Sequence, residues 1–188
     1  MTAMPAAQAM TAQEFMELDR QGRSGTWNLV DGELVVNSPA FPHQRFAARL
    51  IFELANWAGS GPDRGEVVGH LDILIDDHNV YEPDVTWFRS GRVPVDLRPP
   101  YDVPDVAVEV RSPSTWRYDI GVKKTRYEQH GLPELWLVDG DAGVVRILRR
   151  SAPDAPEFDV DLELCGHDDV LESPLLPGFA LPLARLFR

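Results

Sequence analysis

The stretch VPDVAVEVRSPST, residues 103–115, decides the fold class, because it joins a strand of buried type to the start of a helix. Between residues 105 and 111 the side chains alternate with the period of two that is typical of a strand. One face carries only valines: Val106, Val108 and Val110. We expect this face to lie in the core. The other face carries Glu109, and a carboxylate buried in an apolar strand is costly unless it is paired.

A second carboxylate belongs to EPDVTWF at residues 82–88, within a strand that we expect at residues 80–88. Alternation places Asp84 on one face with Glu82 and Thr86; the other face carries Tyr81, Pro83, Val85 and Trp87. If the two strands are neighbours, Asp84 and Glu109 lie side by side. Facing carboxylates repel each other, and a divalent cation relieves that repulsion best. Alternatively, Glu109 forms a structural ion pair with Arg111 or another base.

A helix is predicted from Thr115 to about His130, capped by residues 112–114 and ended by Gly131. One face of this helix carries three polar residues at i, i+4 and i+8: Asp119, Lys123 and Tyr127. The segment 111–130 holds five basic and two acidic residues, which makes it the only sizeable basic patch of the sequence. The alternative to a functional role is an exposed helix, stabilised slightly by an ion pair between Asp119 and Lys123.

The remaining elements are short, because 16 prolines and 14 glycines divide the chain. A capping box at Thr11 predicts a helix to about Arg20, and Asp31-Gly32 predicts a hairpin over residues 27–36. The other expected elements are a helix at 43–57, strands at 66–75, 80–88, 135–139, 144–148 and 158–164, a turn at 76–79 and a proline-rich closing segment. This order predicts a mixed α/β or α+β domain with one central sheet. We expect a flexible tail over residues 1–10 and a single domain over residues 11–188.

The composition restricts the class of protein. The chain has 188 residues, 44% of them hydrophobic, and a formal net charge of −12 from 30 acidic and 18 basic residues. A sizeable core is therefore expected, and the single cysteine excludes a disulfide-stapled fold. No apolar run reaches the roughly 20 residues of a membrane span, and we recognise no secretory signal, so we expect a cytoplasmic protein without membrane contact. The acidic balance argues against non-specific adhesion to nucleic acid and still allows a local basic groove.

Two acidic motifs resemble those of a nuclease superfamily. Pro83-Asp84 and residues 108–111, VEVR, resemble the PD-(D/E)XK motif. The chain is also similar, over roughly residues 15 to 150, to the bacterial Uma-two family of restriction-endonuclease-like proteins. The matching segments are LVDGELVVNSP at 29–39, His43, EPDVTWF at 82–88, VPDVAVEVRSPST at 103–115 and RYDIGVKKTRYEQHGLPELWLVD at 117–139.

The resemblance implies a restriction-endonuclease-like core, a mixed sheet of four or five strands flanked by helices. It also implies a Mg²⁺ or Mn²⁺ ion held by Asp84, by Glu109, by the backbone carbonyl of Val110 and by Glu33, which matches an extra acid of the superfamily. The motif lysine is absent, since Arg111 stands in its place. In this family the lysine appears in the next helix, where Lys123 matches it.

Further residues match the family in accessory positions: His43, Arg111, Asp119 and Tyr127. The alternatives are helix capping for His43 and packing for Tyr127. A phosphate-tracking surface would be formed by Arg117, Lys124 and Arg126. The resemblance thus implies a metal-dependent endonuclease that hydrolyses DNA, and a homodimer is plausible. The alternatives are an inactive nuclease-fold module that binds nucleic acid or a protein, and an enzyme acting on RNA or a small phosphodiester.

Overall fold

The computed structural model describes residues 9–20, 24–96 and 98–188. Most of the tail expected at residues 1–10 lies outside these ranges. Within them, the backbone N–H of Met10 donates to the carbonyl of Gly32 at 3.0 Å. The capping box at Thr11 is confirmed, although helix α1 is shorter than expected and covers only Ala12–Met16.

The central sheet is mixed and holds six strands, one or two more than the family resemblance implies. Only one neighbouring pair, β7 with β8, is parallel, and the other pairs are antiparallel. In spatial order the strands are β10 (Val160–Leu164), β9 (Val144–Arg149), β8 (Glu134–Asp139), β7 (Val106–Val110), β6 (Val85–Phe88) and β3 (Glu66–Val68).

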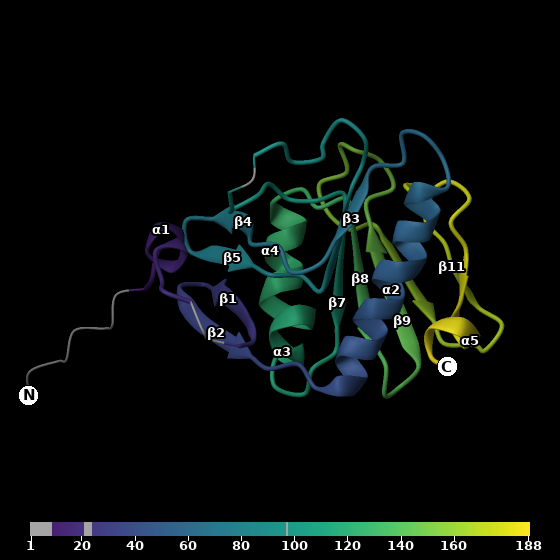
Figure 1. Ribbon diagram of the computed structural model, residues 1–188, viewed down its shortest axis with the longest axis horizontal. Helices are drawn as coiled ribbons and strands as arrows, with labels where there is room; N and C mark the ends of the chain where they lie inside the picture. Colours follow the sequence, from purple (N-terminus) through teal and green to yellow (C-terminus); the bar gives the residue numbers. More distant parts are fainter. Residues whose placement is uncertain (1–8, 21–23, 97) are drawn as a thin grey trace, which may run out of the picture.

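Helices cover both faces of this sheet (Figure 1). Helix α2 (Phe41–Gly59) packs its apolar side against one face, where the three valines of β7 lie. The opposite face carries α3 (Trp116–Tyr118) and α4 (Lys124–Gln129), with Tyr127 fully buried. The valine face of β7 is therefore a core face, as its alternation predicts.

The prediction of continuous strands at residues 66–75 and 80–88 is wrong, because each stretch is divided between two sheets. One half of each, β3 and β6, belongs to the central sheet. Their other halves, β4 (Ile73–Asp76) and β5 (Asn79–Tyr81), join the hairpin strands β1 (Thr26–Val30) and β2 (Glu33–Asn37) in a separate antiparallel sheet. The second break falls at residues 82–84, where Pro83 has no N–H for a ladder and the N–H of Glu82 donates to the side chain of Asn28. Tyr81 consequently packs against Tyr127, on the opposite side of the sheet from Val85.

The helix expected from Thr115 to His130 is interrupted. A wide π-helical turn, Asp119–Lys123, separates α3 from α4, and Gly121 departs from helical dihedral angles there (φ −109°, ψ −106°). Thr115 stands at the start without a side-chain cap, so the expected capping by residues 112–114 is not observed. Gly131 ends the segment with φ +78°, as predicted for a residue that follows a helix.

The proline-rich closing segment belongs to the core. It forms the short strands β11 (Val170–Leu171) and β12 (Leu181–Pro182) and helix α5 (Leu183–Leu186), beside α2 (Figure 1). The indole N–H of Trp57 donates to the carbonyl of Pro177 at 3.1 Å. Among the described residues, no helix is long and apolar enough to cross a membrane.

Candidate metal-dependent active site

Asp84 and Glu109 are neighbours across two antiparallel strands, as the sequence predicts. The register pairs Val85 with Val108, so its continuation sets Asp84 opposite Glu109. The N–H of Asp84 donates to the carbonyl of Val108 at 3.1 Å, which extends the ladder by one residue. Both side chains are buried. The pairing of β6 with β7 therefore brings two carboxylates together, at the beginning of β6 and the carboxyl end of β7.

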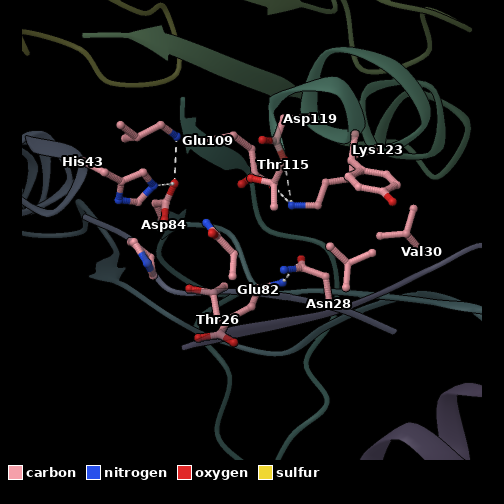
Figure 2. A pocket seen from close by; sticks show the side chains of 15 residues that line it. Thr26, Asn28, Val30, His43, Glu82, Asp84, Glu109, Thr115, Asp119 and Lys123 are labelled. Carbon is pink, nitrogen blue, oxygen red and sulfur yellow. Dashed lines mark hydrogen bonds and ion pairs between the residues drawn. The ribbon is translucent and has the colours of Figure 1, made fainter. Parts of the chain in front are cut away.

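The carboxylate of Asp84 is held in place by two groups. Its Oδ2 accepts a hydrogen bond of 2.7 Å from the backbone N–H of Val110. The same oxygen lies 3.2 Å from Nε2 of His43, in the first turn of α2. The residue at the start of α2 is Ala40, so His43 does not cap this helix. Its ring instead faces Asp84 (Figure 2).

Glu109 is held by two side chains from the segment that follows it. Nζ of Lys123 lies 3.0 Å from Oε1 of Glu109 and 3.0 Å from Oδ1 of Asp119. The hydroxyl of Tyr127 donates to the same Oε1 at 3.1 Å. Because Asp119 and Lys123 are both buried, the alternative of an exposed helical ion pair is not what the structure shows. The π-helical turn and α4 direct all three side chains inward.

Arg111 is not the partner of Glu109. Its guanidinium donates to Oδ2 of Asp139 at 2.6 Å, at the end of the neighbouring strand β8. The base beside Glu109 is therefore Lys123 alone among the described residues.

Two buried carboxylates, Glu109 and Asp119, share one buried lysine, and the Asp84 carboxylate lies close enough to act on Glu109. The pKa of Glu109 is raised to about 8, mainly by burial; Lys123 lowers it, and the Asp119 and Asp84 carboxylates add to the rise. Burial also raises the pKa of Asp119. Burial acts to lower the pKa of Lys123, but the Asp119 and Glu109 carboxylates outweigh it and raise this pKa above its usual value. The ammonium group thus stays charged, and the surplus of acid over base favours an additional cation.

The hollow at this site is small. It lies between the β1–β2 hairpin and the ends of β6 and β7, with a volume of about 20 Å³. That volume holds a water molecule or an ion. Figure 2 shows the carboxylates and His43 on one side of it and the hairpin residues Thr26 and Asn28 on the other.

The donor set fits a hard cation that keeps most of its water. No group of three His, Cys, Asp or Glu side chains within residues 9–20, 24–96 and 98–188 converges on one point. Two carboxylate oxygens, Oδ1 of Asp84 and Oε2 of Glu109, form no hydrogen bond with the described residues. Mg²⁺ is usually bound through one or two carboxylates with several waters.

Glu33 does not line the hollow. It is exposed at the start of β2, where the hydroxyl of Tyr118 donates to it at 3.5 Å. A further acid that lines the hollow, besides Asp84, Glu109 and Asp119, is Glu82, which sequence reasoning placed on the face of Asp84 without a role. Its carboxylate accepts from the N–H of Trp27 at 2.9 Å and lies 3.3 Å from Nδ1 of His70. Thr26, Asn28 and Thr115 line the hollow too, and sequence reasoning gave none of them a functional role.

A family model described as "Putative restriction endonuclease", Uma2, matches residues 12–184. The chain belongs to the Uma2 family. The resemblance inferred from the motifs is therefore confirmed, and it extends to residues at both ends of the chain that the motifs did not include. No curated protein matches the chain.

The Uma2 chain also resembles a crystal structure from Anabaena variabilis ATCC 29413, described as "a putative nuclease belonging to DUF820". The TM-score is 0.78 at 18% sequence identity, over 95% of this chain and 97% of that chain. At this identity the comparison shows the fold, which is the nuclease-like fold expected from the sequence.

The three basic residues expected to form a phosphate-tracking surface do not lie together in this Uma2 protein. Arg117 is exposed beside the hollow and stacks on Tyr118 at 4.7 Å. Arg126 is paired with Asp31 at 2.7 Å. Lys124 lies near Asp161 of β10. It adds slightly to the effect of Arg146, which lowers the pKa of Asp161. Of these three residues, Arg117 is the one that donates to a residue lining the hollow, the hydroxyl of Tyr118, at 2.9 Å.

Proposed function

We propose that the protein is a Mg²⁺- or Mn²⁺-dependent nuclease that hydrolyses phosphodiester bonds in DNA. One observation carries the proposal: two carboxylates on neighbouring strand ends each keep one oxygen that forms no hydrogen bond with the described residues, beside a buried, charged lysine. A bound divalent ion would polarise a phosphoryl oxygen and lower the pKa of a bound water.

Asp84 and Glu109 would hold the ion, with the carbonyl of Val110 as a further ligand. The hydrogen bond from the Val110 N–H and the contact with His43 fix the orientation of Asp84. Tyr127 does the same for Glu109. Partners of this kind orient metal ligands and raise their affinity for the ion. Glu33 as a further ligand stays a prediction, which its exposed position does not support.

Lys123 would stabilise the negative charge that develops on the phosphoryl group. Asp119 keeps its ammonium charged and positioned inside the protein. Arg111 is unsuited to this role because Asp139 already holds its guanidinium. We therefore propose that Lys123 replaces the missing motif lysine.

The size of the hollow restricts how a substrate approaches. With about 20 Å³, it accepts an ion or a water but no nucleotide. The scissile phosphate would meet the ion at the mouth, close to Tyr118 and Arg117. Contacts between basic side chains and phosphates make binding salt-dependent.

A non-catalytic nuclease-fold module is the second candidate. The observation that favours it is the neutralisation already present, because the ammonium group of Lys123 contacts both Glu109 and Asp119. Such a module would keep the ion pairs for stability and bind nucleic acid or a protein elsewhere. A homodimer and a cytoplasmic location stay predictions for either candidate.

Cleavage of supercoiled plasmid and of single-stranded DNA in Mg²⁺ or Mn²⁺ tests the proposed function. Wild type, Asp84→Asn and the control Asp102→Asn, at an exposed position, are purified in parallel. Metal-dependent cutting by wild type and the control, absent in Asp84→Asn, is the expected result. Cutting that persists in Asp84→Asn would contradict the proposal, and no cutting by any of the three would favour the non-catalytic module.

A further inference from the structure

A second and much larger hollow lies at the opposite end of the central sheet. Its volume is about 820 Å³, within the range of roughly 300–1,000 Å³ that is typical of small-molecule sites. Asp105, just before β7, is at its base, whereas Glu109 of the candidate active site is near the other end of the same strand. Four residues of extended chain separate the two by about 13 Å.

This hollow is strongly basic in an acidic protein. Five arginines and two aspartates line it, a formal excess of three positive charges, while the chain as a whole carries −12. The arginines come from three separate stretches of chain, which the fold alone brings together. They are Arg64, Arg89, Arg92, Arg149 and Arg150.

Three of the arginines mainly hold the surrounding loops. Arg64 donates to the carbonyl of Trp57 at 2.9 Å. Arg92 donates to Asp105 at 2.7 Å and to the carbonyl of Val103 at 2.7 Å. Arg150 donates to three backbone carbonyls, those of Glu128, Leu132 and Ala155. These side chains form the rigid frame of the hollow.

The other two arginines keep most of their donors unengaged. The side chain of Arg89 is 63% exposed, and its closest acidic contact is from Nε to Asp105 at 3.4 Å. Arg149 is 16% exposed and approaches Glu134 only at 3.8 Å, with no hydrogen bond to the described residues. A guanidinium has five N–H donors in a planar fork that matches phosphate oxygens. Both groups can therefore take an anion without breaking the frame.

The remaining wall is apolar. It is formed by residues of the closing segment, of the loop after β9 and of the loop before β8, together with two buried indoles: Trp57, Trp87, Pro133, Pro153, Pro174, Leu175 and Pro177. An inorganic ion would leave this wall uncovered. A ligand that carries both a multiply charged anion and a flat apolar part uses both halves of the hollow.

We propose that this hollow binds a phosphate ester of nucleotide size, with Arg89 and Arg149 on the phosphoryl groups and the apolar wall against the remainder. The shared chemistry belongs to free nucleotides and to the phosphorylated end of a nucleic acid strand. The inference does not depend on the proposed function, because no residue of the hollow lines the candidate active site.

Isothermal titration calorimetry of the whole chain in EDTA tests the proposal, with ADP and a 5′-phosphorylated oligonucleotide as separate probes. We compare wild type with Arg89→Gln, with Arg89→Gln/Arg149→Gln and with the charge-matched control Arg98→Gln, whose side chain is 88% exposed outside the hollow. Loss of one charge-assisted contact corresponds to about a tenfold weaker affinity. We expect that loss in Arg89→Gln, a larger one in the double variant and none in the control.

The tighter of the two probes identifies the source of the phosphate. Thermal unfolding checks that each variant is folded, and the exposed Arg89→Gln decides the question if the double variant does not fold. Binding of neither probe to wild type overturns the proposal, as does an affinity that Arg89→Gln leaves unchanged. Binding lost in Asp84→Asn but kept in Arg89→Gln would place the probe in the other site and overturns it too.

Discussion

Nζ of Lys123 lies 3.0 Å from Oε1 of Glu109, and both side chains are buried. The two residues are 14 positions apart, on different elements. Glu109 belongs to β7. Two residues after it, where the motif has a lysine, stands Arg111. The π-helical turn supplies a lysine from the following segment to the same carboxylate.

Removal of this ammonium group is predicted to destabilise the fold strongly. Lys123→Met leaves Glu109 and Asp119 buried without their cation, a change that costs about 3–5 kcal/mol. Chemical denaturation measures the loss, and Lys124→Met, which removes the adjacent and less buried lysine, is the control with little expected effect. Mn²⁺ should raise the melting temperature of Lys123→Met more than that of wild type, because the ion replaces the lost charge. Equal stability of Lys123→Met and Lys124→Met would contradict the role of this pair.

Glu109→Gln is predicted to separate stability from metal binding. The amide oxygen can still accept from Lys123 and Tyr127, and one of three mutually repelling carboxylates is removed. We expect a free energy of unfolding within about 1 kcal/mol of wild type, together with loss of the stabilisation by Mn²⁺ and of any cleavage. Extensive unfolding of this variant would instead assign Glu109 to a structural ion pair.

His43→Ala is predicted to weaken the metal site without abolishing it. His43 contacts Asp84 and not the cation site directly, so its loss frees the carboxylate to rotate. Loss of such a partner weakens metal affinity by about 10–100-fold. Titration with Mn²⁺ measures the change, and Gln44→Ala, on the exposed side of the same helix turn, is the control. An unchanged affinity in His43→Ala would remove His43 from the site.

A hydrogen bond between the closing segment and β8 is predicted to contribute to stability in a way that depends on pH. The hydroxyl of Ser173 donates to Oε2 of Glu134 at 2.7 Å. Burial raises the pKa of Glu134 in spite of this hydrogen bond and that from Trp136. The folded state thus holds this proton more tightly, so the contribution of Glu134 to stability is present at low pH and lost as the pH rises through the folded pKa.

Ser173→Ala removes a hydrogen bond that is stronger to the ionised carboxylate than to the protonated one. We expect a cost of about 1–3 kcal/mol at neutral pH and a smaller cost in acid, where Glu134 is protonated. Urea unfolding at both pH values measures the difference, with the exposed Ser90→Ala as the control. A cost that does not vary with pH would show that the hydroxyl does not act on the charge of Glu134.

Much of the fold can be predicted from local sequence signals. The alternation of valines in β7 and the Asp31-Gly32 turn are strong signals, because each depends on a few adjacent residues. The division of residues 80–88 between two sheets cannot be predicted in this way. It depends on Asn28 and Trp27, more than 50 residues away, which bind the backbone and side chain of Glu82 at the break.

The candidate site also has features that local sequence predicts and features that only the folded chain creates. The proximity of Asp84 and Glu109 could be predicted from strand alternation, whereas the role of Lys123 was implied by the family resemblance; the structure places Lys123 against Glu109. The partnership of His43 with Asp84 could only be suggested by family resemblance, since the packing of α2 on the sheet creates it. The exposed position of Glu33 could not be predicted either, because alternation within the hairpin does not reveal where the hairpin lies relative to β7.

Direct titration of the protein with Mn²⁺, followed by electron paramagnetic resonance of the free ion, tests the central claim most directly. The claim is that Asp84 and Glu109 together form a cation site at the end of β7. Wild type and the exposed control Asp102→Asn should bind Mn²⁺ saturably, and Asp84→Asn should lose this binding while it remains folded. Equal binding of Mn²⁺ by wild type and Asp84→Asn, or none by wild type, would contradict the account.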